Sequence, residues 1–403
     1  MEQWKEYRLG DIALVKGGKR LPKGVNLITV PNLHPYIRVR DLGSSKYLEL
    51  NSSYEYVDEE TQQSISRYIV NTGDIIISIV GTIGLIGIIG ESLNNANLTE
   101  NCVKLVDIKG VDKEYLYYYL ISQYGKSEIL RGTVGAVQAK LPIKNIQDIT
   151  IKAPGFSTQL KISSFLKSLD DKIELNRQIN DNLEQQIKLL FKSWFIENKS
   201  YSWVETPFSE VVFFQEGPGI RNWQYVANNG VRFINIRCII DGDISTQNAN
   251  MISEDEACGK YSHFMLQPMD IVMSCSGTLG RYAIVRHEHL PLCLNTSVIR
   301  FRPLQSSDDY SFIYGYLSSS EFLNKQIEMA CGSVQANFGP THLKQITISF
   351  PPKDSRKNFN NIVMPIIKTI LKNRAEINKL SDLRDTLLPR LISGELKINE
   401  INC

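Results

Sequence analysis

The pattern of apolar and polar positions occurs twice along the chain, in the same order. Residues 73–84, GDIIISIVGTIG, form an apolar run that ends in glycines, and residues 269–280, MDIVMSCSGTLG, repeat it. A short apolar run bounded by glycines is typical of a buried β-strand followed by a turn. We therefore expect the same strand–turn unit in both halves.

Further matching segments surround these two units. The pairs are YIRVRDL (36–42) with FINIRCI (233–239), YLYYYLIS (115–122) with FIYGYLSS (312–319), and the loop-plus-strand segments 132–154 and 332–352. In the last pair, a glycine-rich loop precedes an alternating strand that stops at proline. Matches in a conserved order indicate domain duplication.

Each half continues into a long segment with helical periodicity. Between 157 and 198 the chain has neither glycine nor proline, and apolar residues recur at steps of three and four. This spacing predicts a coiled-coil stripe. The predicted stripe residues are Ile162, Leu169, Ile173, Asn176, Leu183 and Leu190, and then Ile370, Asn373, Ile377, Leu380 and Leu387. We expect Asp170 and Asp171 to lie on a solvated face.

A narrow stripe on a long helix needs a partner of similar length, because an isolated helix is marginally stable in water. The other helix of the chain is the nearest candidate; alternatively, each helix packs on its own globular domain. The sequence thus predicts an α+β chain of two tandem mixed domains and two long helices. The expected domains are 1–156 and 200–353, followed by helical spacer regions at 157–199 and 354–403.

Composition excludes several classes of protein. The 403 residues are 42% hydrophobic and 22% charged, which is ordinary for a globular protein. No secretory leader is apparent, and the longest uncharged stretch, 75–90, is shorter than the ~20 residues that span a bilayer. Seven cysteines without a CxxC pair favour a reducing cytoplasm. Five dispersed histidines argue against a metal site, and we expect the turn at His287–His289 to be solvated.

The chain lacks recognisable catalytic motifs. It has no GxxxxGK[ST] loop, no GxGxxG, no GxSxG and no HExxH. We therefore predict a binding or adaptor protein with no catalytic residues of its own.

Duplex DNA is a partner that suits two similar but diverged domains on a spacer, because two-fold proteins recognise half-sites about one helical turn apart. Arg, Lys, Gln and Asn can contact base edges, and Thr in the GTxG turns can donate to phosphates. The predicted DNA-binding residues are Arg20, Arg38, Arg40, Thr82, Gln138 and Lys140 in the first half, and Arg221, Arg237, Thr278, Arg281, Gln335 and Asn337 in the second.

With these features the whole chain resembles the specificity subunit of type I restriction–modification enzymes. The resemblance rests on the paired strand–turn units, on the strands LPIKNIQDITIKAP and HLKQITISFPP, and on the helix ends LLFKSWFIEN (189–198) and LLPRLISGEL (387–396). It implies two target-recognition domains, each specific for one part of a split, asymmetric DNA site. It also implies that the two helices form an antiparallel coiled coil, giving the molecule pseudo-two-fold symmetry.

The resemblance also implies partners and cofactors. Two modification subunits would bring S-adenosylmethionine and methylate adenine, and two restriction subunits would bring ATP- and Mg²⁺-dependent cleavage, while this chain binds no cofactor. One feature departs from expectation, since 200–353 carries 11 basic and 14 acidic residues. Two alternatives remain: a coiled-coil scaffold whose two domains bind proteins without DNA specificity, and a fused modification or nuclease enzyme.

Overall fold

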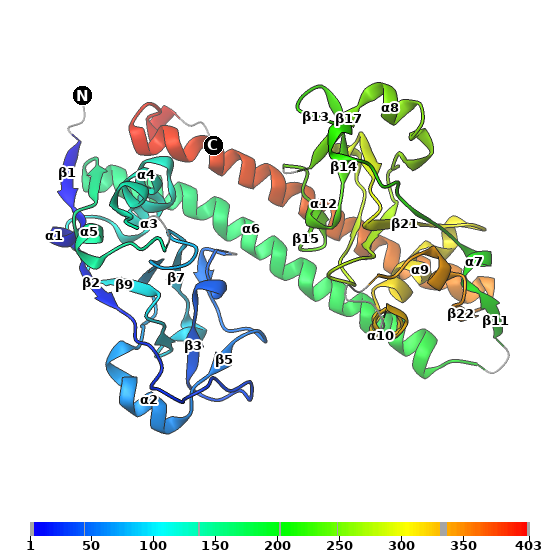
Figure 1. The fold of residues 1–403 in the computed structure, drawn as a ribbon, viewed down its shortest axis with the longest axis horizontal. Coiled ribbons are helices and arrows are strands. Elements are labelled where there is room, and N and C mark those ends of the chain that lie inside the picture. The colour runs from blue at the N-terminus through cyan, green and yellow to red at the C-terminus, as the bar shows by residue number, and fades with distance from the viewer. Residues whose placement is uncertain are drawn as a thin grey trace. The chain divides into compact units, whose positions relative to one another are not determined.

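The computed structural model describes residues 4–43, 45–135, 138–200, 203–247, 249–330 and 337–400. The chain forms two compact units. Unit 1 comprises residues 1–175 and 377–403, and unit 2 comprises residues 176–376. Each unit contains a globular part, called head 1 (residues 4–153) and head 2 (residues 203–350), together with segments of two long helices (Figure 1).

A five-stranded sheet with the order β2-β9-β6-β7-β4 forms the centre of head 1. Its strands are β2 (Leu14–Gly17), β4 (Tyr47–Leu48), β6 (Ile75–Ser78), β7 (Ile86–Ile89) and β9 (Cys102–Val106). All four residues of β6 are buried, which explains its continuous apolar sequence. A second sheet has the order β5-β3-β8, with β3 (Pro35–Ile37), β5 (Glu55–Tyr56) and β8 (Asn97–Leu98).

The remaining elements of head 1 close its core. Strand β1 (Lys5–Arg8) pairs antiparallel with β10 (Thr150–Ala153). The helices are α1 (Leu9–Ile12), α2 (Glu59–Ile65), α3 (Lys113–Ile121), α4 (Gln123–Gly132) and α5 (Ile143–Gln147). The tyrosine-rich helix α3 begins at a cap, because the Asp112 side chain accepts a hydrogen bond from the Tyr115 N–H at 2.9 Å.

Head 2 repeats this plan. Its central sheet has the order β12-β21-β18-β19, formed by β12 (Val212–Glu216), β18 (Ile271–Ser274), β19 (Tyr282–Ile284) and β21 (Val298–Pro303). A second sheet, β13-β17-β14-β20, contains β13 (Tyr225–Val226), β14 (Gly230–Ile234), β17 (Asn250–Ser253) and β20 (Leu292–Leu294). Two further pairs are β15 (Ile239–Ile240) with β16 (Asp243–Ile244), and β11 (Val204–Pro207) with β22 (Thr347–Phe350).

The helices of head 2 are α7 (Phe208–Val211), α8 (Glu254–Cys258), α9 (Tyr310–Leu317), α10 (Ser320–Ala330) and α11 (Pro340–Leu343). The order of β2, β9, β6 and β7 is also that of β12, β21, β18 and β19. Even the register is retained, since Ile75 lies opposite Leu105 and Ile271 opposite Phe301. The predicted duplication of two mixed domains is confirmed.

Two long helices complete the chain. Helix α6 (Phe156–Phe191) continues into a π-helical turn, Lys192–Glu197, and helix α12 spans Lys353–Ser393. In unit 1, Asp170 of α6 contacts Arg384 of α12, and Lys161 contacts Asn399 beyond the end of α12. The later residue of α6 thus meets the earlier residue of the C-terminal segment, so the two run antiparallel.

The same antiparallel pairing occurs in unit 2. The Asn176 amide donates to Glu376 at 3.0 Å, and the Asn180 amide donates to the Ile370 carbonyl oxygen at 3.3 Å. The Asn373 amide in turn donates to the Asn180 side-chain oxygen at 2.9 Å. Polar side chains therefore link the helices within this unit, as expected for register-setting positions.

The predicted stripe residues all lie at buried or half-buried positions. The buried ones are Ile162, Leu169, Ile173, Asn176 and Ile370, and the half-buried ones are Leu183, Leu190, Asn373, Ile377, Leu380 and Leu387. Ile162 and Leu166 of α6 share one hydrophobic cluster with head 1 and with Leu391 of α12. The helices therefore pack on each other and on the heads at once, so the two alternatives weighed from the sequence both hold.

Two expectations about exposure are wrong in part, although Asp171 and His287 are exposed as expected. Asp170 is 8% exposed and pairs with Arg384, so it does not lie on a solvated face. His289 is 6% exposed and belongs to a buried group with Asp243 and Arg286, whereas a solvated turn was expected. In both cases a charged or polar side chain finds a buried partner that is distant in sequence.

Candidate nucleic-acid interface

The strand–turn units have the same hydrogen bonds in both heads. In head 1, the Ser78 hydroxyl at the end of β6 donates to the Thr82 carbonyl oxygen at 2.6 Å and accepts from the Leu85 N–H at 2.9 Å. In head 2, the Ser274 hydroxyl donates to the Thr278 carbonyl oxygen at 2.7 Å and accepts from the Arg281 N–H at 3.0 Å. A buried serine thus fixes each GTxG turn from inside.

The glycines in these turns have backbone conformations that other residues rarely adopt. Gly81 and Gly84 have φ of 80° and 83°, and Gly277 and Gly280 have φ of 69° and 80°. A Cβ atom on Gly280 would also lie 2.6 Å from the Leu323 side chain in α10. The turn is therefore held against the helix behind it, and its threonine lies on the exposed side.

A loop from later in each half lies against the turn. In head 1, the Leu141 N–H donates to the Ile79 carbonyl oxygen at 3.0 Å, and Lys140 forms a β-bridge with Val80. In head 2, the Phe338 N–H donates to the Cys275 carbonyl oxygen at 2.8 Å. Asn337 makes the equivalent bridge with Ser276. Residues 140–141 and 337–338 are therefore brought to the end of β6 and of β18.

A third segment reaches the same end of each head. The Ile79 N–H donates to the Asn101 carbonyl oxygen at 2.8 Å, and the Cys275 N–H donates to the Ser297 carbonyl oxygen at 3.0 Å. Asn101 lies just after β8, and Ser297 lies just after β20. In each head, the GTxG turn, the later loop and the segment that follows β8 or β20 (the post-strand segment) thus form one polar end, which we call the loop end.

The loop end of head 1 brings together the exposed residues Thr82, Gln138 and Lys140. Arg20 also lies there, because its Nε atom is 2.8 Å from a carboxylate oxygen of Glu100 in the post-strand segment. The Arg20 guanidinium holds the pKa of Glu100 below its usual range, although partial burial opposes this shift. Arg20 is therefore partly neutralised within the head.

Arg38 directly precedes the turn Val39–Asp41, which follows β3, and Arg40 lies within that turn. Both guanidinium groups pair with the Glu55 carboxylate, and the side chain of Arg38 is 25% exposed against 55% for Arg40. Since β3 lies parallel to β8, its end is next to Thr99 and the loop end. Arg40 is thus the more available of the two for a ligand.

Head 2 gathers Thr278, Arg281 and Asn337 at its loop end, and all three are exposed. Arg237 lies in the neighbouring turn Ile236–Cys238, where the Ile236 N–H donates to the Ser297 hydroxyl at 3.2 Å. The predicted residue Gln335 lies outside the described residues.

Arg221 is exposed on the loop that follows β12, and its N–H donates to the Gln224 side chain at 2.9 Å. That loop begins beside the loop end, because a Cβ atom on Gly217 would lie 2.3 Å from the Leu294 carbonyl oxygen. Contacts of the twelve predicted residues with DNA remain a prediction.

Sequence reasoning missed the post-strand segments themselves. They are Thr99, Glu100 and Asn101 in head 1 and Asn295, Thr296 and Ser297 in head 2. Each is a polar triplet between two largely buried strands, repeated at the same place in both halves. That repeated interruption was a usable signal, because a polar segment between buried strands has to reach the surface.

Among the described residues, no helix is both long and apolar enough to cross a membrane. No group of three or more His, Cys, Asp or Glu side chains within these residues could hold a metal ion.

Comparison with known proteins identifies the family of this chain. A family model described as the type I restriction modification DNA specificity domain matches residues 1–185 and 203–381. The MjaIX type I restriction enzyme specificity subunit from Methanocaldococcus jannaschii is 24% identical, with 99% of this chain and 95% of that protein covered. The HindI specificity subunit from Haemophilus influenzae is also 24% identical, with 98% and 100% covered.

A solved structure matches over nearly the whole length. The S subunit of a type I restriction-modification system from M. genitalium has a TM-score of 0.56 with this chain at 18% identity. The match covers 97% of this chain and 96% of that chain. The two proteins therefore have the same fold.

Proposed function

Because the chain belongs to the family of type I restriction–modification DNA specificity domains, we propose that it recognises a bipartite, asymmetric DNA sequence as a specificity subunit. One observation carries this proposal. The same loop end occurs in both heads on the same hydrogen-bonded frame, while the exposed side chains on it differ. Lys140 in head 1 has Asn337 as its counterpart at the β-bridge to the turn, for example.

The retained frame and the changed side chains suit two different half-sites. Backbone groups and Lys or Thr side chains position a protein on phosphates, whereas Arg, Asn and Gln distinguish bases. In this proposal the GTxG turns of both heads contact phosphates of the DNA backbone. Arg40 and Gln138 of head 1, and Arg237, Arg281 and Asn337 of head 2, contact base edges.

The chemistry belongs to partner subunits in this proposal. Two modification subunits carry S-adenosylmethionine and methylate adenine in each half-site, and two restriction subunits supply ATP- and Mg²⁺-dependent cleavage. The specificity chain contributes no catalytic group. Recognition by the whole complex also offsets the acidic excess of residues 200–353, because the partners add their own contacts to phosphates.

The test is selection of duplexes from a random library by the assembled modification complex, with methylated adenines mapped in the selected DNA. The expected result is one sequence with two different defined parts and a fixed gap, bound more weakly as salt rises. Exchange of residues 1–156 for another head should change only one part. Equal binding of all duplexes would overturn the proposal and favour a scaffold that binds proteins.

A pair of lysine variants sharpens this test. Lys140→Ala should weaken binding to all duplexes and reduce the slope of log affinity against log salt by about 1, as expected for one lost phosphate contact. Lys109→Ala is the matched control, because Lys109 is exposed beyond the opposite end of β9 from Asn101. Its binding curve should coincide with that of the unsubstituted chain. If the two variants behave alike, Lys140 does not contact DNA.

A further inference from the structure

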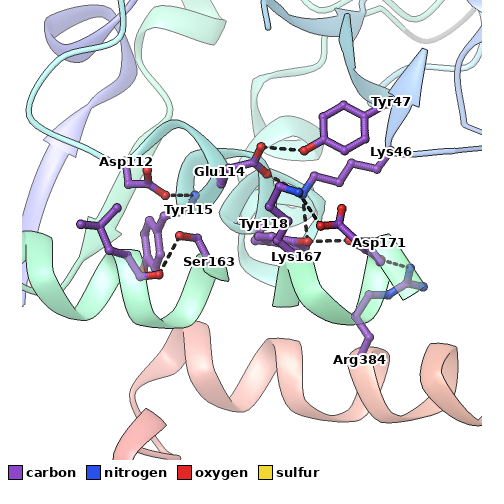
Figure 2. Close-up of polar contacts among 12 residues, drawn as sticks. Lys46, Tyr47, Asp112, Glu114, Tyr115, Tyr118, Ser163, Lys167, Asp171 and Arg384 are labelled. Carbon is purple, nitrogen blue, oxygen red and sulfur yellow. Dashed lines mark hydrogen bonds and ion pairs between the residues drawn. The ribbon is translucent and has the colours of Figure 1, made fainter. Parts of the chain in front are cut away.

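A buried polar cluster joins head 1 to both long helices within unit 1 (Figure 2). The Tyr118 hydroxyl of α3 donates to a carboxylate oxygen of Asp170 in α6 at 2.5 Å. Arg384 of α12 donates to the other oxygen of that carboxylate at 2.8 Å. The Lys46 ammonium lies 3.0 Å from the Tyr118 hydroxyl and pairs with Glu114.

The charges in this cluster balance. Lys46 and Arg384 are cationic, and Glu114 and Asp170 are anionic. Burial lowers the pKa of the Lys46 ammonium, and the Glu114 carboxylate opposes that shift. The cluster is therefore satisfied only when α3, α6, α12 and the residue before β4 all supply their own side chains.

The equivalent positions in unit 2 are apolar. Helices α6 and α12 align without gaps through Asn176-Arg177 and Asn373-Arg374, an offset of 197 positions (373 − 176). Asp170 then corresponds to Ile367, and Arg384 corresponds to Ile187. These two isoleucines are 1% and 0% exposed and belong to the same hydrophobic cluster.

The third member is replaced as well. Alignment of YLYYYLIS with FIYGYLSS places Gly315 of α9 where head 1 has Tyr118. A Cβ atom on Gly315 would lie 2.5 Å from the ring of Phe191, which fills the space of the missing side chain. At these three positions unit 2 therefore has only apolar packing.

We infer that the Asp170–Arg384 pair makes the two halves of the chain select each other and reject a second copy of themselves. The two halves are duplicated, so the segment 180–191 of another copy offers unit 1 the same helical shape as 377–388. At the position of Arg384 that segment has Ile187, so Asp170 would lack its guanidinium partner. This inference does not depend on the proposed function, because it concerns only which helical segments pair.

Both like combinations leave a charge without its partner. Two N-terminal halves would place Asp170 against Ile187, leaving one net negative charge among Lys46, Glu114 and Asp170. Two C-terminal halves would place Arg384 against Ile367, with only the neighbouring Asp385 as a carboxylate partner. A buried charge that loses its partner is costly, so like pairing should be disfavoured by roughly a hundredfold.

The test uses the full chain, cut after folding at a protease site inserted after the exposed Asn198. Differently labelled samples of the cut protein are mixed and followed by native mass spectrometry until exchange is complete. Unlike pairs, 1–198 with 199–403, should persist almost exclusively. Like pairs at statistical abundance would overturn the inference.

A second variant replaces the charges by the residues of unit 2. In Asp170→Ile with Arg384→Ile the charge mismatch between two N-terminal halves is gone, so like pairs of fragment 1–198 should rise by roughly a hundredfold. The matched control is Arg356→Met with Asp309→Leu, which removes another buried ion pair. Both residues of that pair lie in the same fragment, so partner choice should not change. Equal behaviour of the two variants would overturn the inference.

A charge exchange keeps the test decisive if the isoleucine variant does not fold. Asp170→Arg with Arg384→Asp should again give only unlike pairs within its own sample. After mixing with the unsubstituted cut chain, crossed pairs would place two carboxylates or two guanidinium groups together. Such crossed pairs should be depleted by at least tenfold. Free mixing of all fragments would show that this position does not select partners.

Discussion

The two units hold their heads on the long helices at the same two positions, but with opposite chemistry. Near the helix start, Gln159 in unit 1 donates to the Pro154 carbonyl oxygen at 2.8 Å and accepts from the Asp112 N–H at 2.9 Å. In unit 2 the equivalent residue is Arg356, whose Nε donates to Asp309 at 2.6 Å and whose Nη1 donates to the Pro351 carbonyl oxygen. At equivalent helix positions, the head is thus attached by a neutral amide in unit 1 and by an ion pair in unit 2.

Further along the helix the chemistry is reversed. Unit 1 has the ionic Asp170–Arg384 joint, and unit 2 has Ile367 and Ile187 within a hydrophobic cluster. Equivalent contact residues of the two units thus keep their burial and their position on the helix after duplication. Their polar or apolar character differs where the residues that they contact differ as well. At such a place a buried ion pair need not be more stable than apolar packing, but it makes the loss of one partner costly.

The largest expected effect comes from breaking the ion pair near the start of α12. Arg356→Met leaves Asp309, which is 0% exposed, without its cation. We expect the free energy of unfolding of unit 2 to fall by about 3–5 kcal/mol. Amide hydrogen exchange should accelerate in α9 and in the first turns of α12, while the amides of unit 1 keep their rates.

Removal of both charged groups separates the ion pair from simple packing. Arg356→Met with Asp309→Leu should recover much of the loss, because no uncompensated charge then remains. If the single and double variants are equally unstable, the guanidinium stabilises through its packing over the Phe350 ring, 3.8 Å from the ring centre, and not through its charge.

A smaller effect is expected at the reversed joint. Arg384→Ile copies Ile187 into unit 1 and leaves Asp170 with Tyr118 as its remaining partner. Since Arg384 is 25% exposed and water can reach the site, we expect a loss of about 2–3 kcal/mol, at the lower end for a broken buried pair. Urea unfolding measures it, and addition of Asp170→Ile should restore most of the stability.

The neutral amide should be the least sensitive of the three joints. Gln159→Leu keeps the side-chain length but leaves the Asp112 N–H and the Pro154 carbonyl oxygen without their partner. A loss of about 1–2 kcal/mol follows from two neutral hydrogen bonds. If Gln159→Leu costs as much as Arg356→Met, charge is not what distinguishes the joints. The two variants should be compared in the same urea series.

Periodicity and repetition predicted the architecture because both depend on local sequence. The apolar run at 73–80 became β6, the glycines after it formed the turn, and the second copy repeated both. The stripe on α6 and α12 likewise predicted a face of buried and half-buried residues, since a helix places every third or fourth residue on one face.

Contacts between residues that are distant in sequence could not be predicted in the same way. Asp170 was assigned to a solvated face because charge usually means exposure, and its cation comes from Arg384 in the other helix. The same holds for His289, buried with Asp243 and Arg286 from earlier and neighbouring segments. Had the halves been aligned residue by residue, the correspondence of Asp170 with the apolar Ile367 would have signalled a buried site.

The smallest effect concerns a turn that differs between the heads. Asp41 of head 1 accepts the Arg38 N–H at 2.7 Å, and the equivalent residue of head 2 is Cys238. Burial raises the pKa of Asp41 to about 6, against the opposing effect of the Arg40 guanidinium. The folded chain then binds more protons at this carboxyl than the unfolded chain between about pH 4 and pH 6.

Its contribution to stability is therefore fully present below about pH 4 and is lost as the pH rises through about 6. Asp41→Asn cannot ionise and still offers an oxygen to the Arg38 N–H, so it should remove this decline. We expect the variant to gain stability relative to the unsubstituted chain between pH 5 and pH 7, as measured by urea unfolding at both values. Asp107→Asn, at an exposed turn of head 1, should leave the difference between the two pH values unchanged. If Asp41→Asn behaves like that control, the carboxylate of Asp41 is compensated by its arginine neighbours at every pH, and the two heads do not differ in their response to protons at this turn.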